Sequence, residues 1–82
     1  MNRLYFREAF FRRFNKINDK RVQEEIKKKI NQLKARSPIG KKLSGQPYWS
    51  LRVNKYRVIY CLKDDGVEII TILSRKKDYR EL

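Results

Sequence analysis

The sequence predicts an α+β domain in which a short N-terminal strand and a two-helix antiparallel hairpin pack with an antiparallel β-sheet. Two patterns predict it. In the first half of the chain, apolar residues recur every three or four positions, which is the spacing of one helix face. From Tyr48 onward the spacing alternates, and β-branched and aromatic residues dominate three runs. Because 82 residues bury only a thin core, we expect residues 1–82 to form a single domain.

The N-terminal segment is expected to open with a short strand at residues 3–6 and to continue as a helix near residues 7–17. Phe10, Phe14 and Ile17 are spaced at i, i+4 and i+7, so they share one face of that helix. This face is expected to pack into the core.

A second helix is expected after Asn18 or Asp19, either of which can accept the free backbone N–H groups of a first helical turn. It should stop near Arg36, because Pro38 disfavours helical geometry in the residue before it. Its apolar stripe consists of Val22, Ile26, Ile30 and Leu33.

Three strands are expected to follow, at Tyr48–Val53, Tyr56–Leu62 and Val67–Leu73. Asn54-Lys55 leaves two residues for the first turn, and Asp65-Gly66 is typical of a tight hairpin with positive φ angles. An antiparallel meander results. Because strand side chains alternate between faces, we expect one face to pack on the helices through Trp49, Leu51, Val53, Tyr56, Val58 and Tyr60.

The charge of the chain points to a polyanionic partner. Lys and Arg number 22 against 9 Asp and Glu, which gives a net charge of +13, and both halves of the chain are basic. Such a field attracts nucleic acid. The alternative is a charged surface that only interacts with water.

Several classes of function are disfavoured by residues that the sequence lacks. A single cysteine, Cys61, cannot close a disulfide within the chain, which suits a reducing cytoplasm. No stretch approaches the roughly 20 apolar residues that span a bilayer, so no membrane partner is expected. There is no histidine, and the acidic residues show no metal-ligand spacing, so neither imidazole catalysis nor a metal or other cofactor is expected.

The face opposite the predicted core carries the main functional signal. A two-residue turn at positions 54–55 places Arg52 directly opposite Arg57. Like charges in that position cost roughly 0.2–1 kcal/mol, and a bound anion would remove the conflict. Two guanidinium groups suit a phosphate and the charge that develops during phosphoryl transfer. The alternative is that both side chains splay into water.

The C-terminal segment adds Arg75, Lys76 and Lys77, with Tyr79 after them. If the last strand pairs with the middle one, these residues arrive beside Arg57. Tyr79 could stack on a base or act as a phenolic acid or base, and the alternative is a packing role. The same surface is expected to offer an apolar patch for a partner protein, formed by Ile59, Cys61, Ile70 and Ile72.

Taken together, these motifs resemble the RelE/ParE toxin superfamily over essentially the whole chain. The family pattern combines an N-terminal strand, a helical hairpin, a K-L-x-G loop, a basic strand, Y-R-V-I-Y, and a last strand that ends in basic residues near a tyrosine. The matching residues here are Lys42-Leu43-Ser44-Gly45, Arg52, Tyr56-Arg57-Val58-Ile59-Tyr60, Arg75-Lys76-Lys77 and Tyr79.

The resemblance implies a RelE-like, metal-independent endoribonuclease that cuts translated mRNA on the ribosome and leaves a cyclic phosphate. Arg57 resembles the arginine that stabilises the transition state, and Arg52 one of two basic positions on the preceding strand. Ser50 stands at the other basic position, so the general base is not identified. Catalytic roles are implied for Arg52, Arg57, Arg75, Lys76 and Tyr79, and RNA contacts are expected from Lys41, Lys42, Ser50, Lys55 and Lys77.

The resemblance also implies a RelB-like antitoxin as partner, in a toxin–antitoxin hetero-oligomer, with the apolar patch as its contact. Two other functions stay open. One is a gyrase-inhibiting toxin of the same fold that does not cut RNA. The other is a non-enzymatic RNA-binding module, for which a basic composition would suffice.

Overall fold

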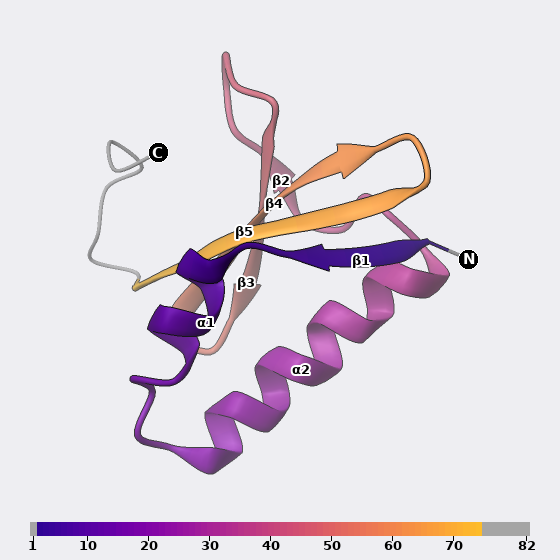
Figure 1. The fold of residues 1–82 in the computed structure, drawn as a ribbon. Helices are drawn as coiled ribbons and strands as arrows, with labels where there is room; N and C mark the ends of the chain where they lie inside the picture. The colour runs from indigo at the N-terminus through magenta and orange to yellow at the C-terminus, as the bar shows by residue number, and fades with distance from the viewer. Residues whose placement is uncertain (1, 75–82) are drawn as a thin grey trace.

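The computed structural model describes residues 2–74, which form two helices on a five-stranded mixed sheet (Figure 1). The strands lie in the order β1-β5-β4-β3-β2, so the first and the second strands along the chain form the two edges. The elements are β1 (Arg3–Phe6), α1 (Glu8–Phe14), α2 (Lys20–Ala35), β2 (Lys41–Lys42), β3 (Tyr48–Val53), β4 (Tyr56–Lys63) and β5 (Gly66–Ser74).

The sheet is mixed because β1, whose pairing the sequence did not predict, pairs in parallel with β5. The other pairings are antiparallel, as expected for β3 with β4 and for β4 with β5. The parallel pair depends on Gly66, which lies opposite Arg3. A Cβ atom at position 66 would lie 2.0 Å from the Arg3 carbonyl oxygen, so only glycine allows the two backbones to approach this closely.

The two predicted helices are present, with α1 shorter than expected. It ends at Phe14, and Ile17 is buried beyond the helix end. The Asp19 carboxylate caps α2 by accepting hydrogen bonds from the backbone N–H groups of Arg21 and Val22, at 3.0 and 3.4 Å. Within residues 2–74, neither helix is both long and apolar enough to cross a membrane.

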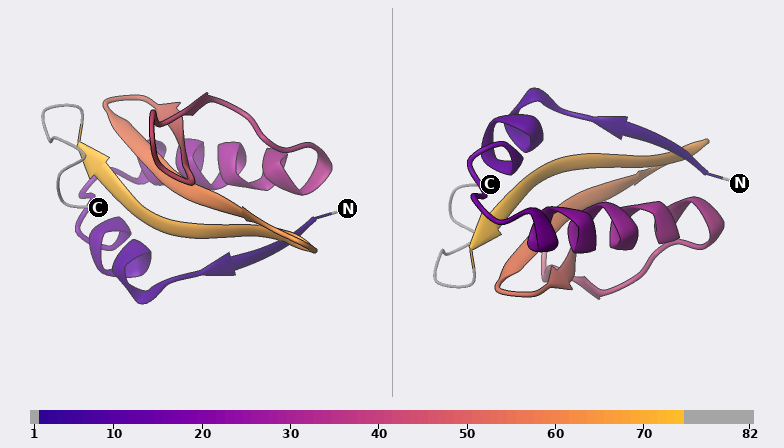
Figure 2. Two further views of the ribbon diagram at one scale, coloured as in Figure 1. Left: turned by 90° about the horizontal axis from the view of Figure 1, so that it is seen from above. Right: turned by 90° about the horizontal axis from the view of Figure 1, so that it is seen from below.

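One face of the sheet packs on the helices, and it forms the main core. Figure 2 shows α2 lying across this face and α1 beside β5. The predicted inward-facing residues of β3 and β4 all belong to this core or pack against it, and so do the four residues of the α2 stripe. The opposite face, which we call the outer face, carries the candidate site.

The two turns of the meander differ from each other. Asn54-Lys55 forms the predicted two-residue turn, and Asn54 adopts a positive φ of 58°. The second turn consists of Asp64-Asp65 because Lys63 pairs with Gly66. The prediction of Asp65-Gly66 was therefore wrong by one residue, since Gly66 is needed inside β5 for its contact with β1.

A β-bulge in β5 changes which side chains reach the outer face. Ile59 pairs with Thr71 and Tyr60 with Ile69, so Ile70 is an extra residue on β5. Past the bulge, Ile72 pairs with Val58 and belongs to the main core, only 3% exposed. The prediction that Ile72 shares the outer face was wrong, because it assumed uninterrupted alternation.

Candidate functional site

The structure places Arg52 directly opposite Arg57 on the outer face, as the length of the turn predicted. Arg52 is exposed and Arg57 is half-buried. Leu73 pairs with Arg57 on its other side, so β5 reaches this point of the sheet, also as predicted. The two guanidinium groups therefore come from neighbouring strands at adjacent positions.

Strand β2, which the sequence did not predict, adds a third cation. Lys41 pairs with Ser50, so both lie on the outer face with Arg52 and Arg57. Lys42 pairs with Trp49 and so originates on the helix-facing side. Two residues are too few to show alternation. The available signal was Gly40, which adopts a positive φ of 100° where the chain turns into β2.

Four of the predicted site residues meet around one hollow in the surface. It lies at the base of the connection between β2 and β3, which projects away from the helices in Figure 1. Its lining consists of Lys41, Lys42, Leu43, Ser44, Gln46, Ser50 and Arg57. The hollow thus combines positive charge with hydroxyl and amide groups, which suits a phosphate and the nucleotide attached to it.

Lys55 does not join this group. It lies in the turn between β3 and β4, and its Nζ is 5.9 Å from the centre of the Tyr56 ring, which packs on the helix side. Ser50 does join it, and it is buried at 5% exposed. Its hydroxyl can donate one hydrogen bond and accept two, but it carries no charge.

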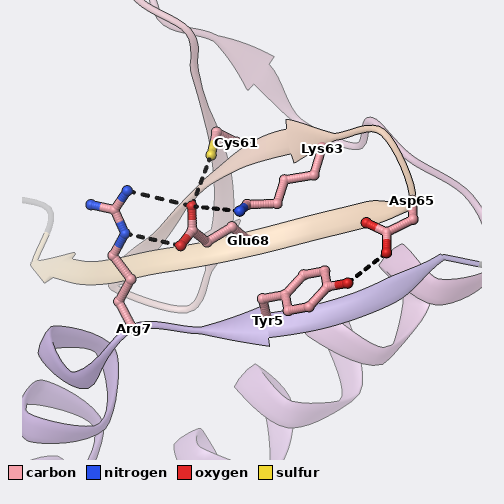
Figure 3. A network of polar contacts seen from close by, with 6 residues as sticks. All are labelled: Tyr5, Arg7, Cys61, Lys63, Asp65 and Glu68. Atoms are coloured by element: carbon pink, nitrogen blue, oxygen red, sulfur yellow. Dashed lines mark hydrogen bonds and ion pairs between the residues drawn. The ribbon is translucent and has the colours of Figure 1, made fainter.

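The other half of the outer face contains a carboxylate that holds the cations around it (Figure 3). Arg7 Nε lies 3.2 Å from Glu68 Oε2, and Lys63 Nζ lies 3.9 Å from Glu68 Oε1. The hydrogen bond from Arg7 is the main reason that the pKa of Glu68 is lowered. Nearby, the Tyr5 hydroxyl donates to Asp65 Oδ2 at 2.6 Å and lowers the pKa of that carboxyl group.

Cys61 belongs to the same network, with its Sγ 3.6 Å from Glu68 Oε1. Burial and the nearby carboxylate both raise the pKa of the thiol. The thiol therefore stays protonated at neutral pH, which is unsuited to nucleophilic catalysis. Among residues 2–74, no three His, Cys, Asp or Glu side chains are grouped as metal ligands would be.

Comparison with known families identifies the chain. The model of the ParE toxin family of type II toxin–antitoxin systems matches residues 5–79. The chain belongs to this family. It is therefore a toxin of the RelE/ParE superfamily. No curated protein matches its sequence.

Solved structures agree with this toxin fold. The chain is 24% identical to a chain of the E. coli RelBE toxin–antitoxin complex, with a TM-score of 0.80, covering 94% of this chain and 100% of that one. It is 20% identical to a chain of the RelB–RelE complex of Methanococcus jannaschii, with a TM-score of 0.76, covering 95% of this chain and 98% of that one. It is also 20% identical to a chain of the YoeB–YefM complex of Staphylococcus aureus, with a TM-score of 0.68, covering 89% of this chain and 95% of that one. At these identities the likeness concerns the fold alone.

The apolar patch expected on the outer face of the toxin is not exposed. Ile59 and Ile70 do lie on this face, but with Leu73 they form a small second core in which Ile59 is 0% and Ile70 6% exposed. Tyr48 and Cys61 pack against it. Only Cys61 of the predicted partner-binding residues is partly accessible, so the prediction of a surface apolar patch that a partner protein covers was wrong.

The C-terminal part of the predicted site lies outside the described residues. This applies to Arg75, Lys76, Lys77 and Tyr79. The described strand β5 ends at Ser74, which pairs with Tyr56 next to Arg57. The roles of Arg75, Lys76, Lys77 and Tyr79 remain predictions made from the sequence.

Proposed function

We propose that this toxin is an endoribonuclease that cuts mRNA during translation. The observation that carries the proposal is that Lys41 and Arg57 line one hollow on the outer face, while Arg52 lies directly opposite Arg57 on the neighbouring strand. A toxin that acted only by fitting its surface to a target would not need two arginines opposite each other. A phosphodiester between them turns a repulsive pair into a binding site.

The proposed reaction uses the RNA's own 2′-hydroxyl as nucleophile. Its oxygen forms a bond to the adjacent phosphorus while the bond from phosphorus to the 5′-oxygen breaks. The leaving 5′-oxygen takes up a proton to replace the one that the 2′-hydroxyl loses, so the products are a 2′,3′-cyclic phosphate and a free 5′-hydroxyl. Negative charge grows on the phosphate oxygens in the transition state, and the Arg57 guanidinium stabilises it. Arg52 holds the strand in line for attack, and Lys41 binds the RNA backbone.

The ribosome is proposed to present the message, as the resemblance to RelE-type toxins implies. The lining of the hollow suits one phosphate and the nucleotide attached to it. A decoding site that holds the message extended would position the rest of the RNA strand. The C-terminal cations and Tyr79 are proposed to complete the site, in the roles given above.

An antitoxin is proposed as the partner of this toxin. The E. coli and M. jannaschii complexes pair RelE with RelB, and the S. aureus complex pairs YoeB with YefM. With a net charge of +13, this chain should bind an acidic antitoxin that covers its cations. The apolar residues predicted for this contact are not proposed again, because Ile59, Ile70 and Ile72 are buried.

Inhibition of DNA gyrase is the second candidate function. It is favoured by the matching family model, which describes the ParE toxin of the parDE system. Gyrase inhibition needs a protein-binding surface and no reacting phosphate. The two functions therefore differ in whether Arg57 takes part in chemistry.

The deciding experiment adds purified toxin to ribosomes programmed with a defined mRNA, and tests gyrase supercoiling of plasmid DNA in parallel. We expect cut message with a cyclic phosphate at its new 3′ end and normal supercoiling. Intact message with blocked supercoiling would reject the nuclease in favour of gyrase inhibition. Intact message, normal supercoiling and retained RNA binding would leave a non-enzymatic RNA-binding module.

A further inference from the structure

Tyr60 is a fully buried tyrosine whose hydroxyl makes two hydrogen bonds to one loop residue. It lies on the helix-facing side of β4 and is 0% exposed. Its hydroxyl accepts a hydrogen bond from the backbone N–H of Ile39 at 2.8 Å and donates one to the carbonyl oxygen of Ile39. Burial raises the pKa of this hydroxyl, so it remains a donor at neutral pH. Tyr60 therefore fixes the loop backbone at Ile39.

The anchored residue lies two positions before Lys41. Between them, Gly40 packs against β3 so closely that a Cβ atom would lie 2.2 Å from the carbonyl oxygen of Ser50. Lys41 then pairs with Ser50. A short series of contacts thus leads from the core through the Ile39 backbone to the cation at the hollow.

Strand β2 has little else to hold it. It is two residues long and lies at an edge of the sheet, where β3 is its one strand partner among residues 2–74. After it, the backbone N–H of Leu43 donates to the carbonyl oxygen of Tyr48 at 2.9 Å. A ladder this short is marginal by itself, so the anchor before it decides where the strand lies.

We propose that Tyr60 is a positioning residue that holds Lys41 and the adjoining wall of the hollow in place for RNA. The inference rests on the proposed nuclease function and extends it to a residue that never touches the RNA. It assigns a functional role to a core hydroxyl on the face of the sheet opposite the site. The Tyr60 ring stabilises the fold, whereas its hydroxyl oxygen fixes the position of Lys41 and the adjoining wall of the hollow.

The test is the Tyr60→Phe variant, which keeps the ring and removes the oxygen. We expect the Leu43 amide to exchange its hydrogen at least about tenfold faster, because β2 opens more often. On programmed ribosomes, KM should rise about tenfold while kcat changes less than about twofold, since a binding contact is loosened. Unchanged amide exchange and unchanged KM would overturn the proposal.

Tyr56→Phe is the matched control. Tyr56 lies on the same strand and the same face, and its hydroxyl makes no hydrogen bond to the part of the chain that the structure describes. We expect wild-type amide exchange and cleavage from this variant. An equal loss in both variants would mean that any hydroxyl removed from this core weakens the protein, and it would overturn a specific role for Tyr60.

A double-mutant cycle with Lys41→Ala separates positioning from general destabilisation. Lys41→Ala alone should raise KM about tenfold, and adding Tyr60→Phe should raise it by less than about twofold more, because the cation that Tyr60 positions is already absent. A further tenfold loss would show that Tyr60 acts by another route and would overturn the proposal. Failure of the nuclease function itself is distinguishable, because the wild-type toxin would then cut no message.

Discussion

The two halves of the outer face carry similar cations in opposite settings. We call Lys41, Ser50, Arg52 and Arg57 the basic half, and the Glu68 network with Arg7, Lys63 and Cys61 the neutralised half. In the neutralised half, the cations surround a carboxylate. In the basic half, the strand register places one arginine opposite another and a lysine opposite a serine.

This difference follows from where the acidic residues stand in the sequence. Residues 26–63 contain no Asp or Glu, and this stretch includes β2, β3 and all of β4. Glu68 enters only with β5. From this comparison, the net charge predicts a polyanionic partner, and the positions of the acidic residues along the sequence predict the basic half as the place where it binds.

The largest expected effect is the loss of cleavage on changing Arg57 in the basic half. Arg57→Ala should lower the single-turnover rate of message cleavage about 10²–10³-fold, because it removes a cation that stabilises developing charge. Arg57→Lys should recover only part of the rate, since an ammonium lacks the forked geometry of a guanidinium. Rapid-quench measurements at saturating toxin would give both rates.

Arg7→Ala is the control from the neutralised half, because its guanidinium is held by Glu68. We expect its cleavage rate to stay within about twofold of wild type. If Arg7→Ala lost as much activity as Arg57→Ala, the distinction between the two halves would fail.

A smaller effect is expected in the salt dependence of RNA binding. Arg52→Ala should reduce the slope of log affinity against log salt by about 0.7, the contribution of one cation that neutralises a phosphate of single-stranded RNA. Lys63→Ala should change the slope much less, because Lys63 lies beside Glu68. Titrations of short RNA at several salt concentrations would measure both slopes, and equal slopes would contradict the assignment.

The smallest effect is expected in the pH dependence of stability. The hydrogen bond from Arg7 lowers the pKa of Glu68, so the pair stabilises the folded toxin above the ordinary carboxyl pKa and is lost as the pH falls through the lowered one. Glu68→Gln should therefore cost less than about 1 kcal/mol of unfolding free energy near pH 7 and nothing in strong acid.

Denaturant-induced unfolding at a series of pH values between about 7 and 3 would measure how the free energy of unfolding depends on pH. Arg7→Ala should flatten the acid-side loss in the same way, because it removes the other member of the pair. A wild-type pH profile in either variant would show that the ion pair does not hold the neutralised half together.

Much of the fold was predictable because its signals are local. The helix stripe, the Asp19 cap and the two-residue turn at Asn54 each depend on a few neighbouring residues. The turn length alone fixed the register that places Arg52 opposite Arg57. That part of the candidate site followed directly from the sequence.

The remaining features depend on contacts between distant segments. The bulge at Ile70 lies in the run Ile69-Ile70-Thr71-Ile72, where every residue suits a strand, so no change in polarity marks the shift. Strand β2 is defined by its pairing with β3, which periodicity does not reveal, although Gly40 marks the turn that leads into it. Lys41 was expected to bind RNA, but its position beside Ser50 came only from the structure.

The claim that the basic half holds a phosphodiester during attack by its own 2′-hydroxyl is tested most directly by changing one atom of the RNA. The measurement compares cleavage of a programmed message with that of the same message carrying a single 2′-deoxynucleotide on the 5′ side of the cut phosphate. We expect the deoxy message to bind equally well and to stay intact at that position. Cleavage there at the normal rate would contradict the account.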